Sequence, residues 1–249
     1  MLGMGSRQSG KAIVVSTCLA ICLYRNATAS TAPADETAPL SVNHCAVSAE
    51  EFKWFMQQER AGVFQELRTR CKFDYGKGFW DRNCAGTTAK KLIEKRTINR
   101  IVRDTVQQLL FKDLGLIEDA RYSVFLENLE NLNANRERAA QQGRVIYGPV
   151  RYGVLQYYGH WMATLQIRAK EKLSRGEFRV TDEKLRVFAG KTWPKRPFEQ
   201  TKELARATYI DQAYQHLVDA RIANAMVKTN AEAVRAILTS ELPSTNEER

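Results

Sequence analysis

The chain has few histidines, and it lacks several common catalytic and cofactor-binding motifs. Only 3 of its 249 residues are histidines, and these lie far apart with no obvious catalytic carboxylate or thiol partner. It has no G-x-S-x-G nucleophile elbow, no H-E-x-x-H zinc motif, no P-loop and no G-x-G-x-x-G dinucleotide motif. We therefore predict no catalytic residue, no cofactor and no enzymatic activity.

Long apolar runs are also missing. The apolar stretch at residues 12–24 is shorter than the roughly 20 residues that a membrane-spanning helix needs. Basic residues precede it and a small-residue A-x-A pattern follows at residues 27–29, so we interpret residues 1–29 as an export signal peptide. Arg25, directly after the apolar stretch, leaves an uncleaved anchor as an alternative, with membrane association through this segment. Either way we expect export, to the periplasm or the outer face of the cytoplasmic membrane.

Runs of basic residues are short as well. No more than two Lys or Arg residues are consecutive, although the formal net charge is +10. A basic protein attracts nucleic acid, anionic membranes or acidic polymers. Because the basic residues are dispersed, a solvated basic surface explains the charge, and we expect no nucleic-acid partner.

Cysteine is scarce, and the chain has no metal-binding pattern. No His lies at ligand spacing with two Cys, so we predict no metal site. Cys45, Cys71 and Cys84 follow the export signal, and an oxidising compartment permits pairing. Cys71 and Cys84 flank one loop and form the preferred candidate disulfide, which leaves Cys45 free or buried. Two unpaired, buried thiols are the alternative.

The rest of the chain has the pattern of one helical domain. We expect a flexible tether at 30–39, a single domain at 40–240 and a disordered tail at 241–249. A short strand segment with a turn at Asn43-His44 opens the domain at 40–47. Apolar periodicity and cap residues then predict helices over 48–70, 87–114, 119–143, from Pro149 to 173, 181–189 and from 197 onward. The last part is either helix throughout or a strand at 222–228 followed by a helix from Asn230.

Aromatic residues gather at 73–80 and 147–161. Residues 145–149 form an elbow between two helices, because Gly and Pro bound β-type residues there. Each ring can pack the core, or it can line an exposed groove for extended chain, since rings contribute large area at low entropy cost. We predict a cradle between 71–86 and 145–165. Its candidate peptide contacts are Phe79, Trp80, Tyr147, Tyr152, Tyr157, Tyr158 and Trp161.

The order of several weak motifs resembles the SurA and PrsA family of chaperones. These motifs are VSAEEF at 47–52, Phe79-Trp80 before a long helix, FLENL at 125–129, VTDEKL at 180–185, and the stretch 197–222. The resemblance covers about 40–240. It implies a mostly α, SurA- and trigger-factor-like peptide-binding domain in which a small two-stranded β element joins the N- and C-terminal segments. It also places a strand at 222–228 beside 40–47.

One departure from the family concerns the isomerase domain. In these chaperones a parvulin-type prolyl isomerase domain lies between the last two motifs, whereas here only residues 190–197 separate them. So short a segment cannot form a domain. The resemblance therefore implies the chaperone module alone.

Three functional hypotheses follow, and the first is favoured. It is an exported chaperone that shields unfolded or extended polypeptide without ATP. The second is an envelope adaptor or structural protein that docks one folded partner, and the third is a prolyl isomerase by family label only. The sequence leaves the clients and the oligomeric state open.

Overall fold

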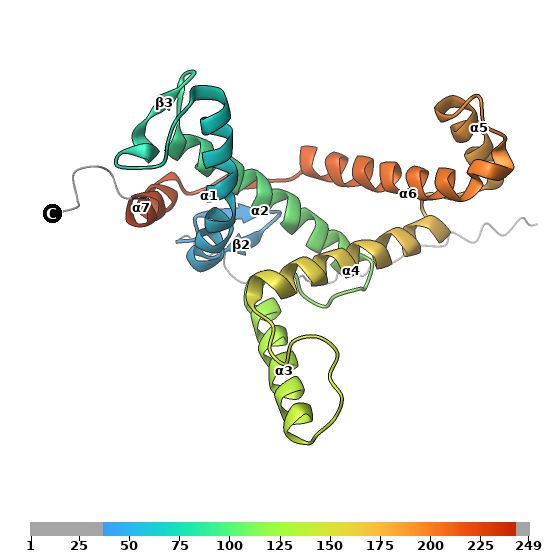
Figure 1. Ribbon diagram of the computed structural model, residues 1–249, viewed down its shortest axis with the longest axis horizontal. Coiled ribbons are helices and arrows are strands. Elements are labelled where there is room, and N and C mark those ends of the chain that lie inside the picture. The colour runs from blue at the N-terminus through green and yellow to red at the C-terminus, as the bar shows by residue number, and fades with distance from the viewer. Residues whose placement is uncertain (1–36, 243–249) are drawn as a thin grey trace, which may run out of the picture. The chain divides into compact units, whose positions relative to one another are not determined.

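The computed structural model describes residues 37–242 (Figure 1). The expected signal segment, most of the tether and most of the tail lie outside these residues. The described part is mostly helical, which confirms the predicted class. Its seven α-helices are α1 (Ala49–Cys71), α2 (Ala89–Asp113), α3 (Tyr122–Gln141), α4 (Val154–Arg175), α5 (Asp182–Thr192), α6 (Phe198–Ala223) and α7 (Ala231–Glu241), with a short 3-10 helix, η1 (Phe79–Asp81).

A small sheet joins the two ends of this part of the chain. Its order is β2 (Cys45–Val47), β1 (Leu40–Val42), β5 (Val227–Thr229), and both pairings are antiparallel. Asn43 and His44 form the β1–β2 turn with φ angles of 48° and 66°, as tight hairpins require. The sheet has three strands rather than the two predicted, because the first segment folds back on itself. The C-terminal strand begins later than predicted, since α6 continues to Ala223.

Cap residues explain most of the helix starts. Side chains accept backbone N–H bonds in four places: Ser48 from Glu51, Thr88 from Lys91, Thr181 from Lys184, and Asn230 from Glu232 and Ala233. The helix predicted over 119–143, with Asp119 as its cap residue, begins only at Tyr122, so this cap is wrong. The Asp119 carboxylate instead accepts bonds from the backbone N–H and the Nε of Arg121.

The core is built around α2, which packs against α1, α4, α6, α7, η1 and β1. The large, fully buried side chains of this core include Phe52, Phe55 and Met56 of α1 and Ile101 and Phe111 of α2. A second, small apolar cluster lies where α5 packs on α6. Its buried members, Leu185, Ala189 and Ala205, are not part of the main core.

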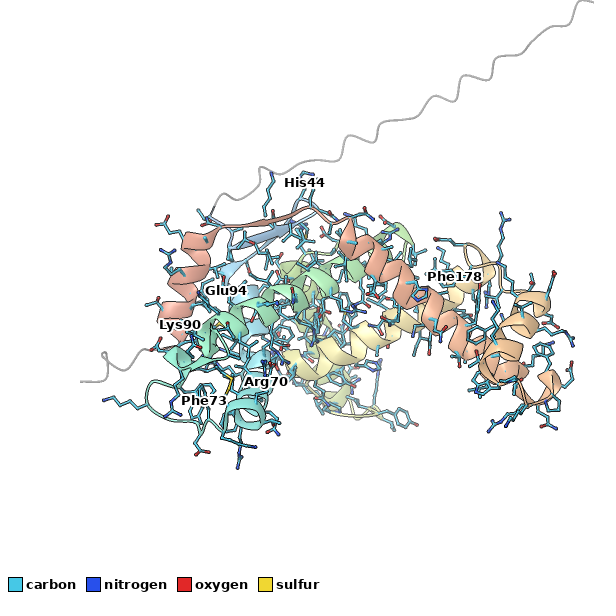
Figure 2. The ribbon with its side chains drawn as sticks, turned by 90° about the horizontal axis from the view of Figure 1, so that it is seen from above. His44, Arg70, Phe73, Lys90, Glu94 and Phe178 are labelled. Atoms are coloured by element: carbon cyan, nitrogen blue, oxygen red, sulfur yellow. A yellow bond between two sulfur atoms is a disulfide. The ribbon has the colours of Figure 1, made fainter. Side chains whose placement is uncertain are left out.

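A disulfide and a small hairpin organise the segment between α1 and α2. Cys71 and Cys84 are bonded, with their Cα atoms 6.1 Å apart. Strands β3 (Asn83–Cys84) and β4 (Thr87–Thr88) pair directly before α2. Figure 2 shows the disulfide, in yellow, close to Phe73 and Arg70. Cys45 is free and half-buried, and burial raises the pKa of its thiol to about 11.

Candidate functional site

Two of the predicted peptide contacts, Phe79 and Trp80, belong to the core. They are 1% and 6% exposed and pack against each other at 5.0 Å between ring centroids. Phe79 also contacts Phe64 and Tyr75. The disulfide closes the loop that carries them, and the two rings pack this loop against α1 and α2. A peptide cannot reach them in this conformation, so their assignment to an exposed groove is corrected.

Tyr158 is also buried, and it holds α4 to α2. Its hydroxyl accepts a bond of 2.9 Å from Gln108 Nε2 and donates one of 3.2 Å to Asp104 Oδ2. Its ring contacts Trp54, Phe55 and Phe125. A side chain with these partners is a structural residue, and its assignment as a peptide contact is likewise corrected.

Tyr157 and Trp161 lie at the edge of the same aromatic cluster. Both are half-buried, and both contact Phe125 of α3, at 5.8 Å and 5.0 Å between centroids. One side of each ring therefore packs against α3. Part of each remains accessible.

Tyr152 is half-buried at the end of the segment that connects α3 and α4. The Asn133 side chain bonds its backbone on both sides, accepting from the N–H at 2.8 Å and donating to the C=O at 3.0 Å. The Arg136 guanidinium lies over the Tyr152 ring, 4.9 Å from its centroid. The end of the connection is thus fixed to α3.

The same arginine holds the middle of this connection. Arg136 donates to the backbone C=O of Tyr147 at 2.7 Å and to that of Pro149 at 2.9 Å and 2.6 Å. Gly148 between them has a φ of 80°, which suits a residue without a side chain. The connection therefore runs back along α3 (Figure 1).

The connection and the first turn of α4 carry exposed apolar side chains. Tyr147 is 87% and Val145 82% exposed, and Val150 of the connection and Leu155 of α4 are exposed as well. We call these four residues the loop surface. Of the seven predicted contacts, Tyr147 is the one that is fully available, and Tyr152, Tyr157 and Trp161 are partly so. Sequence reasoning missed the aliphatic members, because it singled out rings alone.

Glu51 and Asp104 are buried, although their sequence positions predict that they lie on solvated helix faces. Burial raises the pKa of Glu51 to about 8; a backbone bond from Ser48 lowers it and the neighbouring Asp104 raises it further. Burial also raises the pKa of Asp104, against the lowering effect of Arg100, whose Nε donates to it at 3.0 Å. Their negative charges add to burial in raising the pKa of Tyr158. The Ser48-x-x-Glu51 pattern signals a helix start, but no motif signals that these carboxylates are buried together.

Further polar side chains of α2 continue the buried network. Gln107 Oε1 accepts bonds from the Tyr214 hydroxyl of α6 at 2.9 Å and from Gln166 Nε2 of α4 at 3.0 Å. Together with Gln108 and Tyr158, these groups link α2, α4 and α6. These side chains are buried or half-buried and bonded within the network, so we assign the network to folding specificity.

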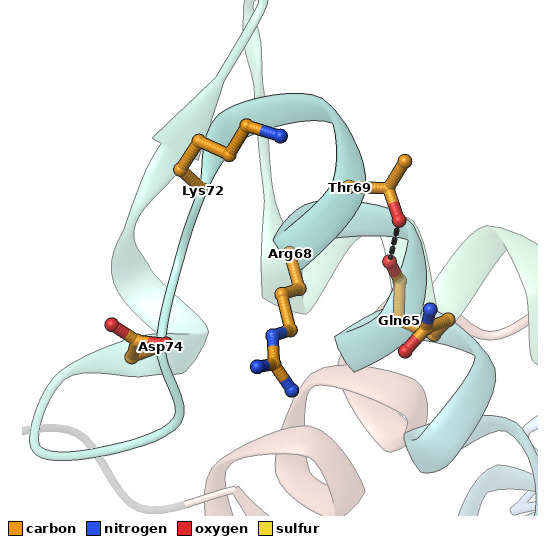
Figure 3. A pocket seen from close by; sticks show the side chains of 5 residues that line it. All are labelled: Gln65, Arg68, Thr69, Lys72 and Asp74. Carbon is orange, nitrogen blue, oxygen red and sulfur yellow. Dashed lines mark hydrogen bonds between the residues drawn. The ribbon is translucent and has the colours of Figure 1, made fainter.

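A polar surface pocket of about 430 Å³ lies at the end of α1. Its lining residues are Gln65, Arg68, Thr69, Lys72 and Asp74, so two cations and one carboxylate face it (Figure 3). The Thr69 hydroxyl is already bonded to the Gln65 backbone C=O at 2.9 Å. The pocket is open and carries mixed charge, which defines no particular ligand.

The described residues also meet neither the requirements of a metal site nor those of a membrane-spanning helix. Residues 37–242 contain no group of three or more His, Cys, Asp or Glu side chains placed to hold a metal ion. In the same range, every helix is too short or too polar to cross a membrane. Comparisons with protein-family models, with curated proteins and with solved structures found no match for the chain.

Proposed function

We propose that this chain is an exported, ATP-independent chaperone that binds unfolded or extended polypeptide and lacks isomerase activity. The observation that carries the proposal is the loop surface, which exposes four large apolar side chains within residues 145–155. A large exposed apolar patch marks an interaction site, and these four side chains are close together in sequence. The resemblance of residues 40–240 to SurA- and PrsA-type chaperones supports the same function.

The attachment of the loop surface suits reversible binding. Asn133 and Arg136 fix the backbone of the connection through bonds to Tyr147, Pro149 and Tyr152. A backbone held in advance loses little conformational entropy when a client binds. Tyr and Val side chains then bury apolar area without requiring a specific client sequence, at roughly 25 cal/mol per Å².

The connection between α5 and α6 supports the non-enzymatic part of the proposal. Helix α5 ends at Thr192 and α6 begins at Phe198, so the five residues 193–197 stand where the family carries its isomerase domain. Catalysis of prolyl isomerisation in a proline peptide would contradict this part, and a peptide assay would detect it because the uncatalysed reaction takes tens to hundreds of seconds.

The decisive experiment measures light scattering of an unfolded client diluted from denaturant. We expect the purified protein to slow aggregation at several-fold molar excess without ATP. The double variant Val145→Ser and Tyr147→Ser should lose most of this effect. The matched control is Ile167→Ser with Val187→Ser, which removes exposed apolar side chains elsewhere and should retain it.

Two outcomes would contradict the proposal. One is an unmodified protein that fails to slow aggregation. The other is a control variant that loses as much protection as the loop-surface variant, which would mean that exposed apolar area in general is responsible. Capture of one tight, folded partner in a pulldown, without unfolded clients, would instead favour the adaptor hypothesis.

A further inference from the structure

Strand β5 lies at an edge of the three-stranded sheet, and two flanking bonds to the first segment set its hydrogen-bond pattern. The backbone N–H of Asn230 donates to Pro39 at 3.0 Å, and that of Asn43 donates to Met226 at 2.8 Å. Hydrogen-bonded and non-bonded pairs alternate along an antiparallel ladder. The bonded pairs are therefore Asn230 with Pro39, Lys228 with Ser41, and Met226 with Asn43.

It follows that Val227 and Thr229 turn their backbone N–H and C=O groups away from β1. Within residues 37–242 no hydrogen bond engages these outward groups. All three residues of β5 are exposed, and no other described element packs extensively along the strand. An edge with free donors and acceptors is a template for another strand.

The two faces of this edge differ in chemistry. Val227 and Thr229 lie opposite Val42 and Leu40, which are fully buried, so they share the core face of the sheet. Lys228 lies opposite Ser41 and therefore points to the other face. An added strand would meet an apolar or β-branched side chain on one face and a cation on the other.

A second copy of this chain fits the edge poorly. A two-fold pairing of β5 with β5 that engages the outward groups of both Val227 and Thr229 would place Lys228 directly opposite Lys228, in a non-bonded pair. Side chains are closest in such pairs, and like charges opposite each other are destabilising. The same geometry favours a strand with an acidic side chain at that position.

We propose that β5 receives an extended segment of another polypeptide, with an acidic residue opposite Lys228 and apolar or β-branched residues on either side of it. The added ladder is short, because Val227 and Thr229 offer four main-chain groups. The complex is therefore weak and reversible. This site lies on a different element from the loop surface and does not rest on the proposed chaperone function.

The test uses the whole protein and two capped, fluorescently labelled peptides, Thr-Val-Glu-Val-Thr and Thr-Val-Lys-Val-Thr, followed by fluorescence anisotropy. We expect the acidic peptide to bind more tightly, by about two- to fivefold, as a cross-strand charge pair contributes. The variant Lys228→Glu should reverse this preference. Reversal by charge exchange cannot arise from a general attraction of acidic peptides to a basic protein.

A backbone variant tests the ladder itself. Val227→Pro removes an outward N–H and leaves the Lys228 bonds to β1 in place, as edge strands tolerate. It should weaken both peptides at least fivefold while the helical circular dichroism and the urea midpoint stay unchanged. If this variant does not fold, the Lys228→Glu exchange still decides the matter.

Three results would overturn the proposal. The first is equal affinity for both peptides in the unmodified protein, and the second is an unchanged preference in Lys228→Glu. The third is a concentration-dependent dimer, seen by sedimentation, that Val227→Pro dissociates. That last result would assign the edge to a second copy of this chain.

Discussion

Glu51 is a residue whose charge state depends strongly on the fold. It belongs to a capping box, in which Ser48 accepts from the Glu51 N–H and the Glu51 carboxylate bonds the Ser48 backbone. Burial raises its pKa from 4.5 to about 8. In the unfolded chain the carboxyl group loses its proton above about pH 4.5, whereas the folded protein keeps it up to about pH 8.

The free energy of unfolding should therefore fall as pH rises from about 4.5 to 8. The contribution of this group has a slope of at most about 1.4 kcal/mol per pH unit. Glu51→Gln preserves the capping box and removes the titration, so its stability should depend less on pH in this window. Urea unfolding at several pH values measures the difference, with exposed Glu50→Gln as the control. Parallel pH profiles for the Glu51 variant and the unmodified protein would contradict the prediction.

The Cys71–Cys84 disulfide is the strongest covalent constraint among the described elements. It closes a loop with a sequence separation of 13 residues, inside which Phe79 and Trp80 are buried. On the entropic interpretation such a crosslink stabilises by about 3 kcal/mol. The double variant Cys71→Ala with Cys84→Ala should lower the urea midpoint, and a reductant should lower only that of the unmodified protein. Alkylated Cys71 and Cys84 recovered from unreduced, oxidised protein would show that the bond is absent.

Arg136 is predicted to control the order of the α3–α4 connection. Lysine has no fork of donors, so Arg136→Lys should lose at least one of the carbonyl bonds to Tyr147 and Pro149. Backbone amides of residues 144–151 should then exchange hydrogen severalfold faster, as measured by mass spectrometry. Arg138→Lys is the matched control, because Arg138 bonds only to residues of its own helix. Equal exchange in both variants would show that the connection does not depend on Arg136.

The sequence pattern predicts where the helices begin better than it predicts which of their side chains are buried. Helix starts at Ala49, Ala89, Asp182 and Ala231 follow from cap residues that act through local bonds. The predicted start of α3 at residue 119 is too early, because the Asp119 side chain accepts a bond from the Arg121 N–H instead of capping the helix. Local sequence does not show which of two neighbouring rings on one helix will be buried. Tyr157 and Tyr158 are adjacent in sequence, yet only Tyr158 meets Asp104 and Gln108 across the core.

Burial of polar side chains depends on tertiary contacts for the same reason. Asp104, Gln107 and Gln108 look like solvated positions of a charged helix, but α4 and α6 cover them. The pairing of β5 with β1 is also a long-range contact. It was anticipated only through the family resemblance, because three exposed residues give no alternation of their own.

At the scale of the whole chain, α5 is predicted to open independently of the main core. It packs on α6, and its buried residues Leu185 and Ala189 belong to a cluster separate from the core around α2. Regions with few buried apolar contacts unfold locally at a lower free energy than the global transition. Amides of residues 182–192 should therefore exchange hydrogen faster than those at the centre of α2.

A pair of core substitutions separates local from global unfolding. Leu185→Ala should speed exchange in α5 and leave the urea midpoint of the main transition nearly unchanged. Ile101→Ala creates a cavity in the main core and should lower the free energy of global unfolding by about 2–5 kcal/mol. If Leu185→Ala shifts the main transition as far as Ile101→Ala does, α5 unfolds together with the core. The two clusters would then form one cooperative unit, held together through α6, the helix that they share.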